Sequence, residues 1–253
     1  MKRILIVASI LLVALSCKKE TPQLQFKTEQ IAAADLPGCK DEICPEIDIQ
    51  LVKADGDGSF TKTINDAVAG VVIDNLSTSP DEEGKIKSID EGLDHFIGDY
   101  REFKNEFSQS PAEYEIKIIS KVSHQDENLI CITMDAYTYM GGAHGYSSKR
   151  YLNFDVQTGQ QLDNKALISD EDGFMTFVEK KFREQQDIPA DDNINGTGYM
   201  FKDDIFALPA NIGFEGNDMI LTYNPYEVAA YAEGQIKVRI PVEEVKEYLA
   251  VEL

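Results

Sequence analysis

Several residue types that usually carry chemistry are scarce in this chain. Its 253 residues include no tryptophan and only three histidines, which leaves little material for a histidine-rich metal centre. Lysine and arginine total 24 against 45 aspartates and glutamates, for a net charge of −21. Binding to nucleic-acid phosphates or to anionic lipid headgroups needs clustered cations, so this balance argues against both. It favours a soluble, self-repelling particle, or one that attracts basic partners.

The motifs of common enzyme classes are missing as well. The sequence contains no Gly-x-Ser-x-Gly, no phosphate-cradling glycine loop, no His-Glu-x-x-His and no spaced His/Cys set for zinc. Paired carboxylates suited to glycoside hydrolysis are uninformative here, because 45 acids form too many pairs. No catalytic constellation is identifiable, so we expect a protein without enzymatic activity or cofactor.

A long apolar run is absent, and the short one at the N-terminus indicates export. Lys2 and Arg3 precede the apolar segment 4–15. As a helix this segment spans roughly 18 Å, short of the about 30 Å hydrocarbon core of a bilayer. A basic start with a short apolar stretch is typical of an export signal.

The end of that run, Ala14-Leu15-Ser16-Cys17, resembles the bacterial lipoprotein processing site, although Leu is more usual where Ala14 stands. The resemblance implies a signal peptide over 1–16 and a lipid on Cys17, which would anchor the chain in the cell envelope, on the periplasmic face or the outer surface. We expect residues 17–38 to form a polar tether. The alternative is an ordinary cleaved secretory signal.

The other cysteines agree with an oxidising compartment. Cys39 and Cys44 are separated by four residues, and the simplest interpretation is a small-loop disulfide at the start of the folded domain. Cys131 lies in an apolar, strand-like run and is expected to be a buried free thiol.

Periodicity along the chain predicts an α+β fold. It has antiparallel sheets with amphipathic helices packed on one side, in two fused subdomains, 39–160 and 161–253. Ser88 begins a capping box ahead of an apolar helical stripe, and Ser169 is expected to cap a further helix. The expected strands are 47–51, 114–123, 129–139, 149–156, the hairpin 212–223, and 235–240; the expected helices are 64–72, 89–107, one after 169, and 242–249.

The most distinctive segment for function is Gly141-Gly142-Ala143-His144-Gly145. Its glycines permit positive φ angles and close approach by another group. One interpretation is functional: His144 contacts a ligand, or acts as a general base helped by Tyr137, Tyr139 or Asp135 in the preceding strand. The alternative is a shaped turn whose histidine satisfies backbone carbonyls. Tyr139, Gly141, Gly142 and His144 are therefore candidate ligand-binding residues.

A second candidate segment is rich in tyrosine. Tyr223, Tyr226, Glu227 and Tyr231 surround a turn that contains proline. Tyrosine offers a large contact area at low entropic cost, so these residues are candidates for a recognition surface. The alternative is a tyrosine-rich corner that locks a strand crossover.

Two acidic loops raise the question of calcium. Asp191, Asn193 and Asn195 match the first half of an EF-hand loop, but position twelve is Lys202 in place of glutamate. The loop at 55–59 matches less well. For both loops we favour solvated turns and expect no metal.

Three ordered motifs resemble one bacterial envelope family. They are Tyr139-Met140-Gly141-Gly142-Ala143-His144-Gly145, Asn153-Phe154-Asp155-Val156-Gln157-Thr158-Gly159 and Tyr223-Asn224-Pro225-Tyr226-Glu227-Val228-Ala229-Ala230-Tyr231. The family is the tandem of domains of unknown function 4163 and 3298. It occurs in the lysozyme-sensing extracellular part of an anti-sigma factor and in the non-catalytic part of a peptidoglycan deacetylase. The resemblance covers roughly residues 40 to 250 and implies a binding or sensing module, because the deacetylase's metal ligands belong to a separate domain. Many members have Ala-Pro-Tyr where this chain has Ala229-Ala230-Tyr231.

Three functions follow as hypotheses. The first is a lipid-anchored envelope module that recognises a lysozyme-like protein. The second is a peptidoglycan- or polysaccharide-binding lipoprotein. The third is a wall hydrolase that uses His144. The acidic balance is consistent with the first, the missing tryptophan counts against the second and the missing catalytic motifs count against the third, so we rank the first ahead.

Overall fold

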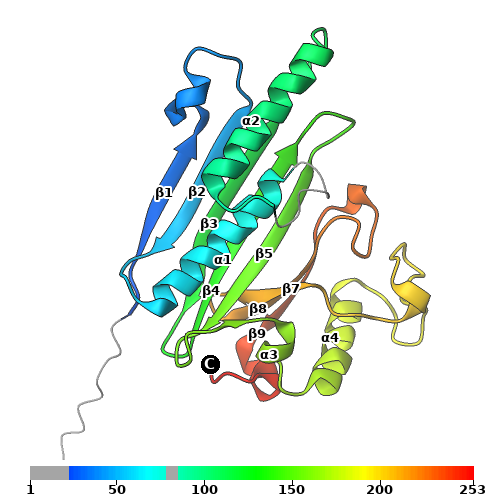
Figure 1. Cartoon of the computed structure of the whole chain (residues 1–253). Helices are drawn as coiled ribbons and strands as arrows, with labels where there is room; N and C mark the ends of the chain where they lie inside the picture. Colours follow the sequence, from blue (N-terminus) through cyan, green and yellow to red (C-terminus); the bar gives the residue numbers. More distant parts are fainter. Residues whose placement is uncertain (1–22, 78–84) are drawn as a thin grey trace, which may run out of the picture.

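The computed structural model describes residues 23–77 and 85–253 (Figure 1). It confirms the α+β class, with two sheets and helices arranged around them. The predicted signal peptide, residues 1–16, and Cys17 lie outside the described residues. Within those residues, no helix is both long and apolar enough to cross a membrane.

The larger sheet has six strands in sequential order, β1 to β6. Every neighbouring pair is antiparallel except β2 and β3, which run parallel. This pair departs from the expected all-antiparallel sheet because both long helices lie between β2 and β3 in the chain, and such a crossover returns the chain in the same direction. The strands are β1 (Phe26–Ala32), β2 (Glu46–Ala54), β3 (Glu115–Gln125), β4 (Leu129–Tyr139), β5 (Tyr146–Asp155) and β6 (Gln161–Leu162).

The long helices α1 (Ser59–Leu76) and α2 (Ile89–Glu106) cover one face of this sheet (Figure 1). Their buried side chains pack on the inward residues of β2 to β5 in one apolar core. The predicted cap of α2 is confirmed, because the Ser88 hydroxyl accepts the backbone N–H of Glu91 at 3.1 Å. The Glu91 carboxylate in turn accepts from the backbone N–H of Lys87 at 2.8 Å, one residue before the partner expected in a capping box.

Strand β1 corrects the expected tether, residues 17–38. Phe26–Ala32 pairs along its whole length with β2. Its central side chains are exposed on both faces of this edge strand, so the sequence shows no apolar alternation there. Backbone pairing with β2 and the contacts of Phe26 and Ile31 with the core hold the strand, and two exposed ion pairs accompany them, Lys27–Asp55 at 2.7 Å and Lys53–Glu29 at 2.6 Å.

The expected disulfide between Cys39 and Cys44 is present, with the two Cα atoms 5.4 Å apart. It closes the loop before β2. Arg101 of α2 holds this loop by donating to the carbonyl oxygens of Gly38, at 2.6 Å, and Ile43, at 3.1 Å. The disulfide therefore shapes a loop that is docked on the helical layer.

The second subdomain is built on a three-stranded antiparallel sheet. The helix expected after Ser169 is α4, but its capping side chain is Asp170, which accepts from the N–H of Gly173 at 3.0 Å. Phe182 of α4 lies at the centre of an aromatic core. The elements are α3 (Asn164–Leu167), α4 (Glu171–Gln185), β7 (Asn211–Glu215), β8 (Asp218–Tyr223), β9 (Ile236–Pro241) and α5 (Val242–Val245), with 3-10 turns at Ala33–Asp35, Pro37–Cys39, Lys202–Asp204, Tyr231–Glu233 and Lys246–Tyr248.

The two subdomains share a core, because the second sheet packs on the face of β4 and β5 that the long helices leave free. Leu129, Cys131 and Tyr151 of the large sheet belong to the hydrophobic cluster of the second subdomain. Cys131 is the expected buried free thiol. Its sulfur accepts the backbone N–H of Phe214 at 3.3 Å, and burial raises the pKa of the thiol to about 11. The backbone of Gly213 lies against the Tyr151 ring.

A buried charged network crosses the same interface. The Lys149 ammonium, with its side chain 7% exposed, lies 3.1 Å from Asp135 and 3.3 Å from Glu215. The Tyr151 hydroxyl donates to Glu215 at 3.0 Å. One lysine of β5 thus joins an acid of its own sheet to an acid of the second sheet.

Gly213→Ala should destabilise the fold, because the new Cβ would lie 2.4 Å from the Tyr151 ring. We expect a loss of about 1–3 kcal/mol in the free energy of unfolding, measured by urea denaturation. Gly98→Ala is the matched control. Its Cβ meets nothing within 4 Å in α2, so it should be neutral or stabilising. Equal effects of the two substitutions would contradict the packing described here.

Glu215→Gln should reduce the loss of stability in acid. Burial alone would raise the pKa of Glu215, but the Lys149 charge and the hydrogen bonds from Tyr151 and Lys149 bring it below its ordinary value of 4.5. A carboxylate whose folded-state pKa is depressed stabilises the fold above the unfolded-state pKa, and this contribution disappears as the pH falls through the folded-state value. Thermal melts from neutral pH down to below pH 4.5 should show a shallower decline for the variant, and no change of slope for the exposed control Glu247→Gln.

Candidate functional site

The two segments singled out in the sequence meet in the structure. The glycine loop (Gly141–Gly145) joins β4 to β5, and the tyrosine turn (Asn224–Tyr231) follows β8. The Tyr231 hydroxyl donates to the carbonyl of Gly145 at 2.7 Å. The rings of His144 and Tyr231 stack, with centroids 3.8 Å apart and planes 18° from parallel. The site therefore takes one part from each subdomain.

His144 is held in one tautomer. Its Nδ1 lies 2.9 Å from the carbonyl oxygen of Gly145, which can only accept, so Nδ1 carries the proton. Its Nε2 then accepts from the Tyr226 hydroxyl at 3.3 Å. Among the described residues no carboxylate bonds to this ring, and Asp135, considered as a helper, pairs with Lys149. The arrangement suits contact with a ligand better than general-base chemistry.

Tyr226 projects from this surface in an unusual backbone conformation. Its φ is +71°, and the residue is 59% exposed. A left-handed conformation costs a non-glycine residue roughly 1–2 kcal/mol. Such strain persists where the surroundings hold the residue, and it gathers at functional sites.

The Glu227 carboxylate provides one of those restraints. Its two oxygens accept the backbone N–H groups of Ala210 and Asn224, each at 2.9 Å. Glu227 is therefore a positioning residue in this structure, although the sequence suggested it as a ligand contact.

Asn224 provides the second restraint, a role that its local sequence does not indicate. Its side chain accepts from the backbone N–H of Lys149 at 2.8 Å and donates to the carbonyl of Lys149 at 3.1 Å. This amide completes a two-bond ladder between the tyrosine turn and β5. The Asn-Pro sequence signals a turn but gives no sign of the distant partner.

Tyr223 does not reach the surface. It is 1% exposed, and its hydroxyl donates to the carbonyl of Ala207 at 2.8 Å. Burial raises the pKa of this phenol. The residue serves as a core aromatic, so its assignment as a ligand contact is corrected.

A groove of about 680 Å³ runs beside the glycine loop. Gly145 packs so closely on Tyr137 that a Cβ there would lie 2.4 Å from the ring. The Tyr139 hydroxyl donates to the carbonyl of Gly142 at 3.1 Å, and both Gly141 and Gly142 have positive φ. The groove is lined by Ser110, Pro111, Ala112, Glu113, Glu115, Tyr137, Tyr139, Gly142, Ala143, His144 and Gly145.

The loop considered for calcium uses its amide oxygens internally. The Asn193 side chain accepts the N–H of Asn195 at 2.7 Å, and the Asn195 side-chain oxygen accepts the N–H of Phe201 at 2.8 Å. The Asn195 amide group also donates to Asp204 at 2.6 Å. These bonds, together with exposed Asp191, describe a self-supported turn. Within the described residues no group of three potential metal ligands occurs.

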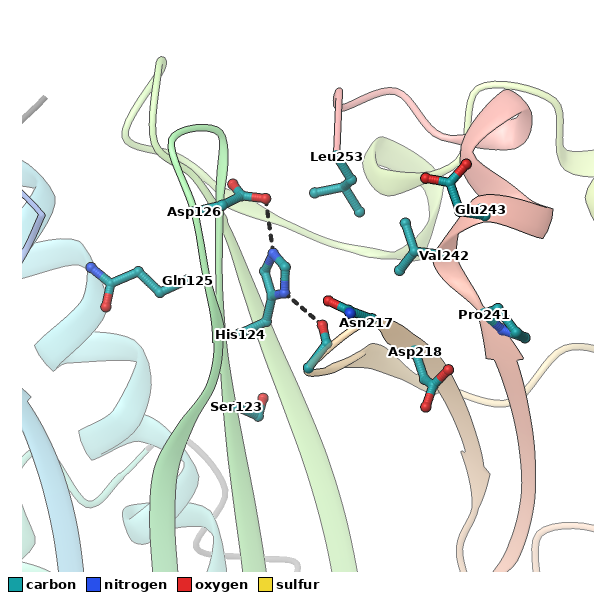
Figure 2. Close-up of a pocket in the computed structure, with 11 residues that line it drawn as sticks. Ser123, His124, Gln125, Asp126, Asn217, Asp218, Pro241, Val242, Glu243 and Leu253 are labelled. Atoms are coloured by element: carbon teal, nitrogen blue, oxygen red, sulfur yellow. Dashed lines mark hydrogen bonds and ion pairs between the residues drawn. The ribbon is translucent and has the colours of Figure 1, made fainter. Parts of the chain in front are cut away.

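A second cavity, of about 720 Å³, lies between the β3–β4 turn and the second sheet (Figure 2). His124 lies in its wall and had no signal in the sequence. One ring nitrogen faces the carbonyl of Gly216 at 2.9 Å and the other faces Asp126 at 3.0 Å. Burial opposes ionisation of Asp126, but hydrogen bonds from two backbone N–H groups and from His124 lower its pKa. Both ring nitrogens of His124 have partners within the protein, so this histidine joins the β3–β4 turn to the second sheet.

Comparison with known proteins agrees with the division of the site between two parts of the chain. Residues 39–147 match the family described as "Deacetylase PdaC", and residues 164–243 match the "Protein of unknown function (DUF3298)" family. The 3298 half of the expected resemblance is thus confirmed. The first half matches the deacetylase-associated family.

Individual relatives are distant. A peptidoglycan-N-acetylmuramic acid deacetylase PdaC from Bacillus subtilis is 23% identical over 175 residues, which cover 65% of this chain and 37% of that enzyme. The chain therefore matches little more than a third of the enzyme's length.

Two crystal structures share the fold. A DUF3298 family member from Bacteroides fragilis has a TM-score of 0.70 at 20% identity and covers 92% of this chain and 96% of its own. A DUF3298 family protein from Pseudomonas aeruginosa has a TM-score of 0.59 at 18% identity and covers 91% and 95%. At these identities the likeness establishes the fold alone.

Asn224→Ala should loosen the tyrosine turn selectively. The substitution leaves the backbone N–H and carbonyl of Lys149 without their side-chain partner, and we expect a loss of about 1–3 kcal/mol of stability. Amide hydrogen exchange should rise across residues 224–231 and stay unchanged in α2. Asn217→Ala, at an exposed turn, is the control, and the same exchange pattern in both variants would contradict the bridging role.

Proposed function

We propose that this chain is a non-catalytic recognition module of the bacterial cell envelope. Its ligand would bind at the surface formed by His144, Tyr226 and Tyr231 with the adjoining groove. The observation that carries the proposal is Tyr226, an exposed ring held in a strained conformation by two bracing side chains. A strained conformation at an exposed tyrosine is expected where the position of the ring matters for contact with a ligand.

An envelope location is supported from several sides. The N-terminal sequence favours export with a lipid on Cys17, the Cys39–Cys44 disulfide suits an oxidising compartment, and the similar Bacillus subtilis protein is named as a peptidoglycan deacetylase. We propose that the region of this chain that matches the enzyme serves in recognition and does not carry out the deacetylation.

The placement of the site suits a tethered protein. Strand β1 starts at Phe26, opposite Ala54 at one end of the large sheet. The groove lies at the other end, beside the loop between β4 and β5, where Glu115 pairs with Tyr139. The nine residues of β2 span roughly 26 Å between the two ends. A chain anchored through its N-terminus would therefore present the site away from the membrane.

A lysozyme-like protein is the partner we propose first. The net charge of −21 speeds encounter with a cationic protein, and an exposed tyrosine beside a histidine stack offers a contact centre.

Peptidoglycan glycan is the second candidate, favoured by a specific observation. The groove beside the stack is lined by Tyr137 and Tyr139, whose rings offer stacking surfaces for sugars. A wall hydrolase using His144 ranks last, because its ring has no carboxylate partner among the described residues.

Tyr226→Gly is the sharpest test of the recognition surface. Glycine accepts a positive φ, so the variant should fold at least as stably as the wild type while lacking the ring. In calorimetric titrations of the chain from Lys18 onward with a lysozyme, at about 0.15 M salt, we expect saturable binding by the wild type. The variant should bind at least about tenfold more weakly.

Ile205→Ser, at another exposed apolar side chain, is the control and should bind like the wild type. Binding that vanishes with modest added salt in all three proteins would indicate charge attraction alone. A flat lysozyme titration with saturable retention on purified sacculi, lost in Tyr226→Gly, would select the glycan. Unchanged binding of Tyr226→Gly to both would refute the proposed surface.

A further inference from the structure

One carboxylate in the groove has no partner. Glu115 opens β3 and is half-buried, yet it makes no side-chain hydrogen bond or ion pair within residues 23–77 and 85–253. Its acidic neighbour in the groove is satisfied, because Glu113 pairs with Lys104 at 2.7 Å and accepts from Tyr100. An unpaired carboxylate that is partly withdrawn from water is unfavourable on its own, and a cation would relieve it.

Two tyrosines flank this carboxylate on the same face of the sheet. Tyr139 lies directly opposite Glu115 in the β3–β4 register, and Tyr137 lies two residues along. Side chains at such positions are about 4.5–8 Å apart at their Cβ atoms. Burial raises the pKa of Tyr137, and the negative charge of Glu115 raises it further, as expected for a carboxylate near the phenol.

Among residues 23–77 and 85–253, no lysine or arginine pairs with the Glu115 carboxylate. Lys117, which stands opposite Tyr137, is directed to Asp48 at 3.9 Å, and Lys104 is engaged by Glu113. The Tyr137 ring is also fixed in place by the Gly145 backbone behind it. The corner is thus a preformed combination of aromatic rings and one free negative charge.

We infer that the corner formed by Glu115, Tyr137 and Tyr139 binds the guanidinium group of an arginine side chain on a protein partner. A planar guanidinium can pair with the carboxylate and lie against a tyrosine ring at the same time. The inference rests on the proposed function and specifies its chemistry. The net charge of −21 favours a partner whose surface carries such cations.

A small probe tests the corner independently of any partner. The full chain is titrated with Nα-acetyl-arginine amide and with its neutral isostere Nα-acetyl-citrulline amide, while the amide resonances of Tyr137 and Gly145 are followed by NMR. We expect saturable shifts with the arginine probe at roughly millimolar concentration and at least about tenfold weaker binding of the citrulline probe.

Glu115→Gln should weaken the arginine probe at least about fivefold and leave the citrulline probe unchanged, since only the charge is removed. Glu127→Gln, at the exposed β3–β4 turn, should have no effect. Equal binding of the two probes would overturn the inference. So would unchanged binding of the arginine probe to Glu115→Gln, provided that the variant melts like the wild type.

The two proposals can fail separately. Partner binding that depends on Tyr226 but not on Glu115 would overturn the arginine corner and keep the recognition surface. Glu115-dependent arginine binding without retention on lysozyme or sacculi would support the corner and count against the proposed function. A third outcome is retention on sacculi that is abolished by Glu115→Gln but is not displaced by free arginine. That result would indicate the ammonium group of a wall peptide and would overturn the assignment to a protein partner.

Discussion

The geometry of the site depends on one residue of β5, Lys149. Its ammonium group is buried between Asp135 of the large sheet and Glu215 of the second sheet. Its backbone N–H and carbonyl are both bonded to the Asn224 side chain. A buried charge is tolerated only with partners in place, so the two sheets must meet in this arrangement. The same residue therefore sets the packing of the subdomains and the position of the tyrosine turn.

This dependence explains why the recognition surface is composite. The glycine loop is short and rigidly placed by β4 and β5, whereas the tyrosine turn comes from the second subdomain. Neither segment alone would keep His144, Tyr226 and Tyr231 in contact. Strain at Tyr226 is balanced by the hydrogen bonds that the Glu227 carboxylate accepts from the backbone N–H groups of Ala210 and Asn224, outside the proposed contact surface. In the proposed surface, some residues would contact the ligand and others, such as Glu227, hold them in place.

Much of the fold was readable from local pattern. Apolar periodicity located both long helices and the two hairpins, and residue chemistry identified the disulfide and the Cys131 thiol. Strand β1 was not predicted because the central side chains of this edge strand are exposed and polar, so its sequence has no apolar alternation. The parallel β2–β3 pairing escaped because local periodicity carries no information on strand direction.

The candidate site was predicted less completely. The glycine loop and Tyr226 stood out by composition, and the structure brings them together. Asn224, His124 and Glu115 have roles set by residues far away in the chain, such as Lys149 for Asn224 and Gly216 for His124. Tyr223 looked like its neighbours, but it is the last residue of β8, a strand that is buried on both faces from Met219 to Tyr223.

We propose that the glycine loop and the tyrosine turn act as one surface. The most direct test is a hydrogen-exchange footprint of the saturated complex with a bound lysozyme or glycan. The account predicts slowed exchange in residues 137–146 and in residues 224–231 together, with α1 and α2 unchanged. Protection confined to one of the two segments, or to the outer faces of α1 and α2, would contradict it.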